Sequence, residues 1–149
     1  MKIIHMESFE DIRTIHDALY MYNTAFIDNP LTAPPECVHY PEEDAIIVRN
    51  DNNKTMGGAV FHFLNSPRRI FVDYFYMDPS LRGEGWGHKV FVELEKYAKE
   101  KGAESISMGT HDFQAPGFYK KEGYTIVKVT PAPMKKAPEN NHYNLTKKM

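Results

Sequence analysis

The chain has 149 residues, of which 42% are hydrophobic and 26% charged, so it fits one globular domain with a filled core. Its net charge of −2, from 18 basic and 20 acidic residues, offers no basic field for a nucleic-acid backbone, so we expect no nucleic-acid partner. No apolar run approaches the roughly 20 residues that span a bilayer, the charged N-terminus does not resemble a signal peptide, and the single Cys37 allows no internal disulfide. These features predict a cytoplasmic protein without membrane contacts.

The predicted elements begin with a short strand over 2–6 and a helix that starts after Ser8. Ser8 is a favourable N-cap with Asp11 three residues on, and apolar residues then recur at helical spacing as far as about Asn23. Segment 26–35 contains three prolines and is predicted to be a loop.

A hairpin and a buried strand follow. The turn at 51–54 joins a strand over 44–49 to a second strand whose main part is 58–64. The next run, IFVDYFYM at 70–77, is almost continuously apolar, so we expect a central strand that is covered on both faces.

The C-terminal half alternates helices and strands. We expect a helix over 86–101 with Gly102 as its C-cap, a strand over 105–109, a short helix over 115–122 that ends at Gly123, a strand over 124–129 and a last edge strand over 142–146. Strand 70–77, helix 86–101 and strand 105–109 form one βαβ unit, which requires a parallel strand pair. The fold class is therefore α+β: a single domain over 1–149 with a mixed central sheet of six to seven strands flanked by helices.

A glycine-rich turn, RGEGWG over 82–87, stands between the buried strand and the second helix. Glycines allow a tight turn and a close approach to backbone N–H groups, and a helix N-terminus adds unpaired donors and a positive dipole end. Together with Arg82 this is an anion site suited to a pyrophosphate. A turn without a ligand is the alternative. A Walker loop is excluded because His88 follows Gly87, and the GxGxG spacing with one βαβ unit disfavours a dinucleotide fold.

Two motifs resemble the GNAT superfamily of acetyl-CoA-dependent N-acetyltransferases. The pattern Arg-x-x-Gly-x-Gly after a strand that ends in an apolar residue, Asp78 and Pro79 resembles its signature, and FQAPGFYKKEGY over 113–124 resembles its second motif. Together the motifs cover about residues 70–127. The pattern FQAPxFYKKxGY, with a late His-Tyr-x-Leu strand at 142–145, is similar to one bacterial subgroup of small GNAT proteins.

The resemblance implies a binding site for acetyl-CoA. The pyrophosphate would be held by backbone N–H groups of Arg82, Gly83, Glu84, Gly85, Trp86, Gly87 and His88. The strand over 70–77 would splay from its parallel neighbour, and the pantetheine arm would contact the backbone of Tyr76 and Met77. Asp112 stands where much of the superfamily has an Asn that contacts this arm or a water.

Two residues are the catalytic candidates. The resemblance implies that Tyr119 protonates the departing thiolate; the alternative is a core tyrosine, and we expect Phe118 to fill the core and Tyr119 to lie at its edge. Asp73 interrupts an apolar strand, where an unpaired carboxylate is costly, so it is a candidate base or a structural hydrogen-bond acceptor. His142 and His111 are weaker candidates for the base.

The expected activity is direct attack of a primary amine on acetyl-CoA, with a backbone N–H, that of Met77, meeting the oxyanion. No metal is expected, and Cys37 has no His partner at a spacing that indicates a nucleophile. The acceptor, a small-molecule or peptide amine, would lie against Tyr20, Tyr22, Phe26, Tyr74 and the late hairpin. A non-catalytic coenzyme A-binding or sensing domain is the alternative, the single βαβ unit disfavours a nucleotide-dependent oxidoreductase, and a homodimer is left open.

Overall fold

The computed structural model describes residues 1–27, 31–38, 40, 42–114 and 116–149, so residues 28–30 of the predicted loop and Ala115 of the predicted helix 115–122 lie outside the described part. The strands are β1 Lys2–His5, β2 Glu43–Arg49, β3 Thr55–Asn65, β4 Arg68–Met77, β5 Ser105–His111, β6 Thr125–Pro131 and β7 Asn141–Lys148. The helices are α1 Phe9–Asn23, α2 Trp86–Glu100 and α3 Gly117–Lys121, with 3-10 turns η1 Pro79–Leu81 and η2 Asp112–Gln114.

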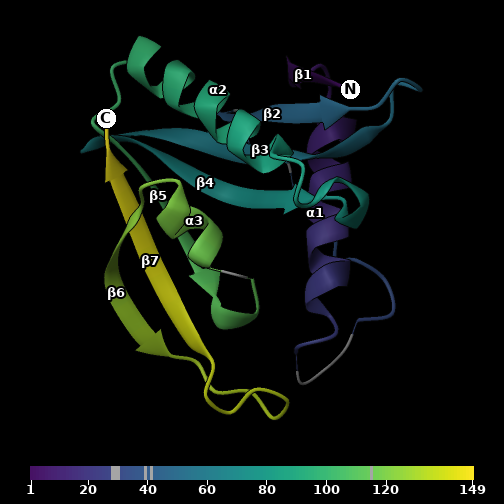
Figure 1. The fold of residues 1–149 in the computed structure, drawn as a ribbon, viewed down its shortest axis with the longest axis vertical. Helices are drawn as coiled ribbons and strands as arrows, with labels where there is room; N and C mark the ends of the chain where they lie inside the picture. The colour runs from purple at the N-terminus through teal and green to yellow at the C-terminus, as the bar shows by residue number, and fades with distance from the viewer. Residues whose placement is uncertain (28–30, 39, 41, 115) are drawn as a thin grey trace.

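The strands form one seven-stranded sheet in the order β1-β2-β3-β4-β5-β7-β6 (Figure 1). Only β4 and β5 pair in parallel among these neighbours, which confirms the predicted α+β fold with a mixed sheet and one parallel pair. The prediction that strand 142–146 lies at an edge is wrong. β7 pairs with β5 on one side and β6 on the other, and β6 is the edge. The backbone pairing of β7 with two strands sets this position, which the polar side chains of β7 do not indicate.

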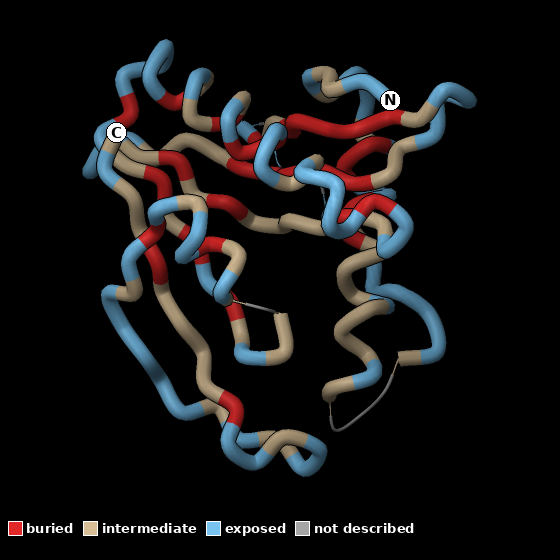
Figure 2. Tube along the Cα trace, in the orientation of Figure 1, coloured by how far each residue is buried: buried red, intermediate tan, exposed pale blue. Residues whose placement is uncertain are grey.

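The two faces of the sheet carry different helices. In β2, Ile46 and Val48 belong to the core cluster that includes the buried face of α2, whereas Ala45 and Ile47 belong to the cluster that includes Ile12 of α1. This alternation is the period of a strand, so α1 and α2 cover opposite faces and β4 lies between them as predicted. Figure 2 shows buried residues along β2, β3 and the inner side of α2, while β6 is largely exposed.

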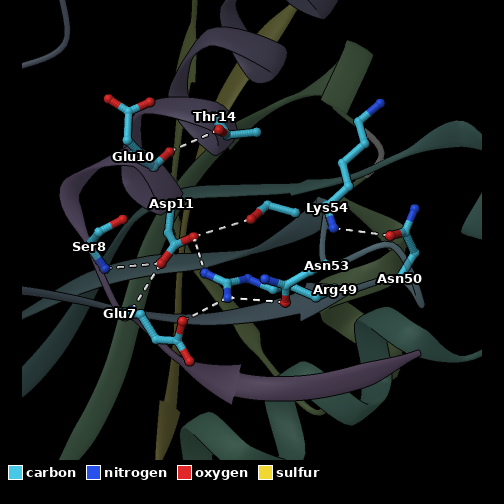
Figure 3. A network of polar contacts seen from close by, with 10 residues as sticks. Glu7, Ser8, Glu10, Asp11, Thr14, Arg49, Asn50, Asn53 and Lys54 are labelled. Carbon is cyan, nitrogen blue, oxygen red and sulfur yellow. Dashed lines mark hydrogen bonds and ion pairs between the residues drawn. The ribbon is translucent and has the colours of Figure 1, made fainter.

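A buried polar network fastens the start of α1 to the sheet (Figure 3). Asp11 Oδ2 accepts from the backbone N–H groups of Glu7, at 2.9 Å, and Ser8, at 3.1 Å, so the predicted N-cap is confirmed. Asp11 Oδ1 accepts from Arg49 Nη2 of β2 at 2.6 Å and from Thr55 Oγ1 of β3 at 3.2 Å. The helix start is therefore held to two strands at once.

The parallel pair opens partway along its length. The register between β4 and β5 ends with Val72 opposite Met108, although β4 continues to Met77 and β5 to His111. At this point β4 also has a bulge, because Phe61 of β3 faces Val72 while Val60 faces Tyr74, which leaves Asp73 as the extra residue. Figure 1 shows the two strands diverging beyond it.

Candidate active site

A pocket of about 590 Å³ extends from the glycine turn, through the opening between β4 and β5, to the side of α1. It is lined by Leu19, Tyr22, Val72, Asp73, Phe75, Tyr76, Met77, Leu81, Arg82, Gly83, Gly85, Trp86, Gly87, His88, Met108, Gly109, Thr110, Gln114, Phe118, Tyr119 and Lys121. The pocket therefore brings together both catalytic candidates and most of the predicted cofactor-binding residues.

The glycine turn leaves open space at the start of α2. Gly83 and Gly85 have φ of 82° and 83°, and a Cβ atom at either would meet no heavy atom within 4 Å. The carbonyl of Gly85 accepts the first helical bond, from Lys89 N at 3.1 Å, so the N–H groups of the first turn have no intrahelical acceptor. Free donors beside open space are what a phosphate group requires.

Two basic side chains face this end of the pocket. Arg82 Nε donates to the carbonyl of Met77 at 3.2 Å, and its guanidinium lies over the rings of Tyr22, at 5.0 Å, and Tyr76, at 5.7 Å. Lys121 of α3, which was not predicted from the sequence, also lines the pocket. Lys121 is three residues from Phe118, so both lie on one face of the helix, and this spacing could have predicted that Lys121 reaches the pocket.

Phe118 and Tyr119 take the reverse of their expected positions. Tyr119 is the more buried, at 8% exposure, while Phe118 is half-buried and stacks on Phe75 with ring centroids 5.3 Å apart. The reason is the glycine turn: a Cβ at Gly87 would lie 3.1 Å from the Phe118 ring, so Phe118 packs against α2 where no side chain intervenes. Both residues nevertheless line the pocket.

Tyr119 is flanked by aromatic rings from α2 and β4. Its own ring lies 5.9 Å from Phe91 of α2 and 6.1 Å from Phe75 of β4, centroid to centroid. Burial raises the pKa of the Tyr119 phenol well above its usual range. The hydroxyl therefore stays protonated at neutral pH and is able to donate.

Asp73 lies where the two strands part. Its Oδ2 atom is 2.7 Å from Nδ1 of His62 on β3, and the two side chains are 20% and 24% exposed respectively. Burial raises the pKa of Asp73 to about 6, and neighbouring Glu43 contributes in the same direction, whereas the hydrogen bond with His62 lowers it. His62 was not predicted from the sequence, because the strand bulge that brings the pair together has no local signal.

The backbone of Met77 faces the opening. Asp78 N donates to Met56 O of β3 at 2.8 Å, and successive peptide groups in a strand point to opposite edges. The N–H and carbonyl of Met77 therefore point away from β3, which agrees with the bond from Arg82 to the Met77 carbonyl.

Some predicted residues lie elsewhere. Glu84 is exposed and does not line the pocket, and Asp112 accepts from Asn141 N at 2.7 Å and Tyr143 Oη at 2.6 Å. His111 stacks on Phe113 at 5.1 Å and has its pKa lowered by burial. The last of this group, His142, lies over Gly109 at the strand opening, where a Cβ would meet its Nε2 at 2.7 Å.

The predicted acceptor residues divide into three groups. Tyr22 lines the large pocket. The ring centroids of Tyr20 and Tyr74 lie 6.4 Å apart on the α1 side of the sheet. Phe26 stacks on Phe113 at 4.9 Å, and both line a second pocket of about 580 Å³ beside the late hairpin.

The residues that the structure describes contain neither a cluster of metal-binding side chains nor a membrane-spanning helix. None of these residues form a cluster of three or more His, Cys, Asp or Glu side chains able to hold a metal ion. None of the helices they form has the length and apolarity needed to cross a bilayer.

Comparisons with known proteins identify a family for the sequence. Residues 6–124 match the family model described as Acetyltransferase (GNAT) family. Blasticidin-S acetyltransferase of Streptomyces morookaense is 33% identical over 82 residues, which are 54% of this chain and 59% of that protein, so the match spans less than two thirds of the relative.

Solved structures share the fold over most or all of the chain. An acetyltransferase from Bacillus cereus ATCC 14579 superposes with a TM-score of 0.64 at 27% identity, covering 98% of each chain. A structure from Bacillus anthracis in complex with acetyl coenzyme A has a TM-score of 0.64 at 19% identity, covering 77% of this chain and 70% of that one. The second likeness concerns the fold, and the bound acetyl coenzyme A belongs to that protein.

Proposed function

Because the chain belongs to the Acetyltransferase (GNAT) family, with acetyl-CoA as its cosubstrate, we propose that it transfers the acetyl group to a primary amine of a small molecule or peptide. The observation that carries the proposal is the single pocket that joins the glycine turn to Asp73 through the opened strand pair. We propose further that the chain belongs to the bacterial subgroup with the FQAPxFYKKxGY pattern.

The residues of the pocket suit coenzyme A. The open space at Gly83 and Gly85 and the unpaired N–H groups of Trp86, Gly87 and His88 would accept the pyrophosphate. Arg82 and Lys121 would add positive charge at this end. The pantetheine arm would follow Tyr76 and Met77, where β4 is paired with β3 but no longer with β5. Bound there, acetyl-CoA supplies an activated thioester carbonyl.

In the proposed reaction, Asp73 takes a proton from the ammonium group of the acceptor. The neutral amine attacks the carbonyl carbon, a C–N bond forms, and the Met77 N–H donates to the oxygen that becomes negative. The C–S bond then breaks, and the Tyr119 hydroxyl donates to the leaving sulfur. The second amine proton replaces the one that Tyr119 gives up.

Binding of acetyl-CoA is tested at Gly85. Asparagine tolerates a positive φ, and in this chain Asn53 has φ of 62°, so Gly85→Asn should keep the turn while placing a side chain in the open space. Loss of one charge-assisted hydrogen bond costs about 1.5–3 kcal/mol, so calorimetry should find the Kd for acetyl-CoA raised about ten- to hundredfold. Gly102→Asn, at the other end of α2 with φ of 72°, is the matched control. Equal affinity in both variants would contradict the assigned phosphate site.

Transfer is tested by thiol release from acetyl-CoA with a panel of amines: spermidine, kanamycin, lysine and an alanine-initiated peptide. Release that depends on one of these amines supports the transferase. Tight acetyl-CoA binding with no release from any class of amine would instead favour the sensing domain.

A further inference from the structure

We infer that His62 is a positioning residue for the proposed base, holding the Asp73 carboxylate ionised and oriented at the wall of the pocket. The inference rests on the proposed function, since it concerns the group that would take the proton of the acceptor. His62 belongs to neither sequence motif, and only the fold brings it to Asp73.

The geometry separates the two residues by role. Asp73 lines the pocket, whereas His62 lies on the neighbouring strand and is absent from the lining. An ionised carboxylate can only accept hydrogen bonds, so at 2.7 Å Nδ1 of His62 must carry the proton and donate it to Oδ2. The imidazole therefore contacts the carboxylate from the neighbouring strand β3 and does not take part in the pocket lining.

The bulge explains why the carboxylate needs this donor. Asp73 is the extra residue of β4, so it has no cross-strand partner in the register. On the same row of the sheet, Glu43 of β2 faces His62, and His62 faces Phe71 of β4. Glu43 is 6% exposed, which places a second carboxylate beside the first with little solvent to screen it.

The charges around Asp73 oppose one another. Burial and Glu43 both favour the protonated form of Asp73, and both raise its pKa, while His62 favours the ionised form. Tyr74 of β4 is a further titratable group beside Asp73, and its ring centroid lies 5.3 Å from that of His16 and 6.4 Å from that of Tyr20 on α1. His62 is thus the neighbour that keeps the base available near neutral pH.

Three variants test this role in the free protein, without any acceptor. His62→Leu removes the donor, His62→Asn retains an N–H near the position of Nδ1 without a titrating ring, and Glu43→Gln removes the opposing charge. The readout is the pH titration of the Asp73 carboxyl carbon by ¹³C NMR, assigned by its disappearance in Asp73→Asn.

The expected midpoint is about 6 in the wild type. It should move upward by about one pH unit in His62→Leu, stay near the wild-type value in His62→Asn and move downward in Glu43→Gln. An unchanged midpoint in His62→Leu would overturn the proposal. If that variant does not fold, a downward shift in Glu43→Gln with retention in His62→Asn supports it, and an upward shift in His62→Asn overturns it.

Kinetics separate positioning from a merely structural role. The acid limb of kcat/KM against pH should move upward in His62→Leu, measured with the panel amine that the wild type uses fastest. A midpoint of 7 in place of 6 lowers the ionised fraction at pH 6 from about one half to about one tenth, so activity there should fall about fivefold and recover by pH 9. A loss by one factor at every pH would overturn the role. Failure of acetyl-CoA to bind would instead defeat the proposed function, and the NMR titration would still decide on His62.

Discussion

Asp11 and Asp73 are both carboxylates removed from bulk water and paired with a basic side chain, yet their pKa values move in opposite directions. Asp11 is 4% exposed, and burial alone would raise its pKa, but Arg49 and the backbone N–H groups of Glu7 and Ser8 hold it below the usual range. Asp73 is less buried, but it has one side-chain donor, His62, and a second carboxylate as a neighbour. Burial and that carboxylate raise its pKa to about 6.

The donors around Asp11 outweigh its burial, whereas the single donor beside Asp73 does not outweigh burial and the neighbouring Glu43. Asp11 accepts four hydrogen bonds, from Glu7, Ser8, Arg49 and Thr55. It joins α1 to the sheet. Asp73 is left with an unfavourable charge at neutral pH, which is expected of a group retained for chemistry.

The largest expected effect is that of Asp73→Asn on turnover. If Asp73 is the base, the variant should lose about 10²–10⁴-fold in kcat while its affinity for acetyl-CoA stays the same. The checks are thiol release and calorimetry. Asp51→Asn, on a side chain that is 97% exposed, is the control. A variant as active as the wild type across the pH range would make Asp73 a structural residue.

Tyr119→Phe should reduce turnover by a similar factor, about 10²–10⁴-fold, because it removes the proposed proton donor and keeps the ring. Tyr124→Phe is the matched control. Tyr124 is 3% exposed, its hydroxyl has no hydrogen-bond partner among the residues that the structure describes, and it does not line the pocket. Its variant should keep full turnover. A Tyr119→Phe enzyme within a factor of about two of the wild type would return Tyr119 to a packing role.

Arg49→Met should weaken the fold and spare the pocket. Removing one partner of a buried ion pair costs about 3–5 kcal/mol, because Asp11 is left uncompensated. Urea unfolding measures this loss. Arg13→Met breaks the exposed pair with Glu10, at 2.5 Å, and should cost at most about 1 kcal/mol. Equal losses in the two variants would contradict the structural role assigned to the buried network.

The smallest effect is a stability difference with opposite signs in two Asp→Asn variants. The raised pKa of Asp73 means that its stabilising contribution is present below the unfolded value, near 4, and is lost as pH rises through about 6. Asp73→Asn should therefore be more stable than the wild type by about 1–3 kcal/mol above pH 7, and the advantage should vanish toward pH 4.

Asp11→Asn should behave in the opposite way. The lowered pKa of Asp11 contributes stability above its unfolded value that is lost as pH falls. This variant should be less stable than the wild type at pH 7, with a difference that narrows below about pH 4. Urea titrations of both variants between pH 3 and pH 8 check the prediction. If the stability difference from the wild type changed with pH in the same direction for both variants, the opposite pKa shifts of the two carboxylates would be contradicted.

Much of this protein could be predicted from local sequence. The Ser8 cap, the βαβ unit, the glycine turn and the order of the elements each depend on residues that are close in the chain, and the structure confirms them. Fold class followed from the parallel pair that the βαβ unit requires. Tyr119 was singled out by motif resemblance and Asp73 by its position in an apolar strand; both line one pocket, and their chemical roles stay predictions.

The remaining features depend on contacts between distant parts of the chain. The position of β7 inside the sheet, the pairing of Asp11 with Arg49 and that of Asp73 with His62 join residues at least 11 positions apart. The reversal of Phe118 and Tyr119 arises because Gly87 of another helix leaves room for one ring. Sequence periodicity reports which side of an element is apolar. It does not report which polar groups the packing brings into hydrogen-bond range, and in this protein those through-space pairs decide which carboxylate supports the fold and which one stands ionisable at the pocket.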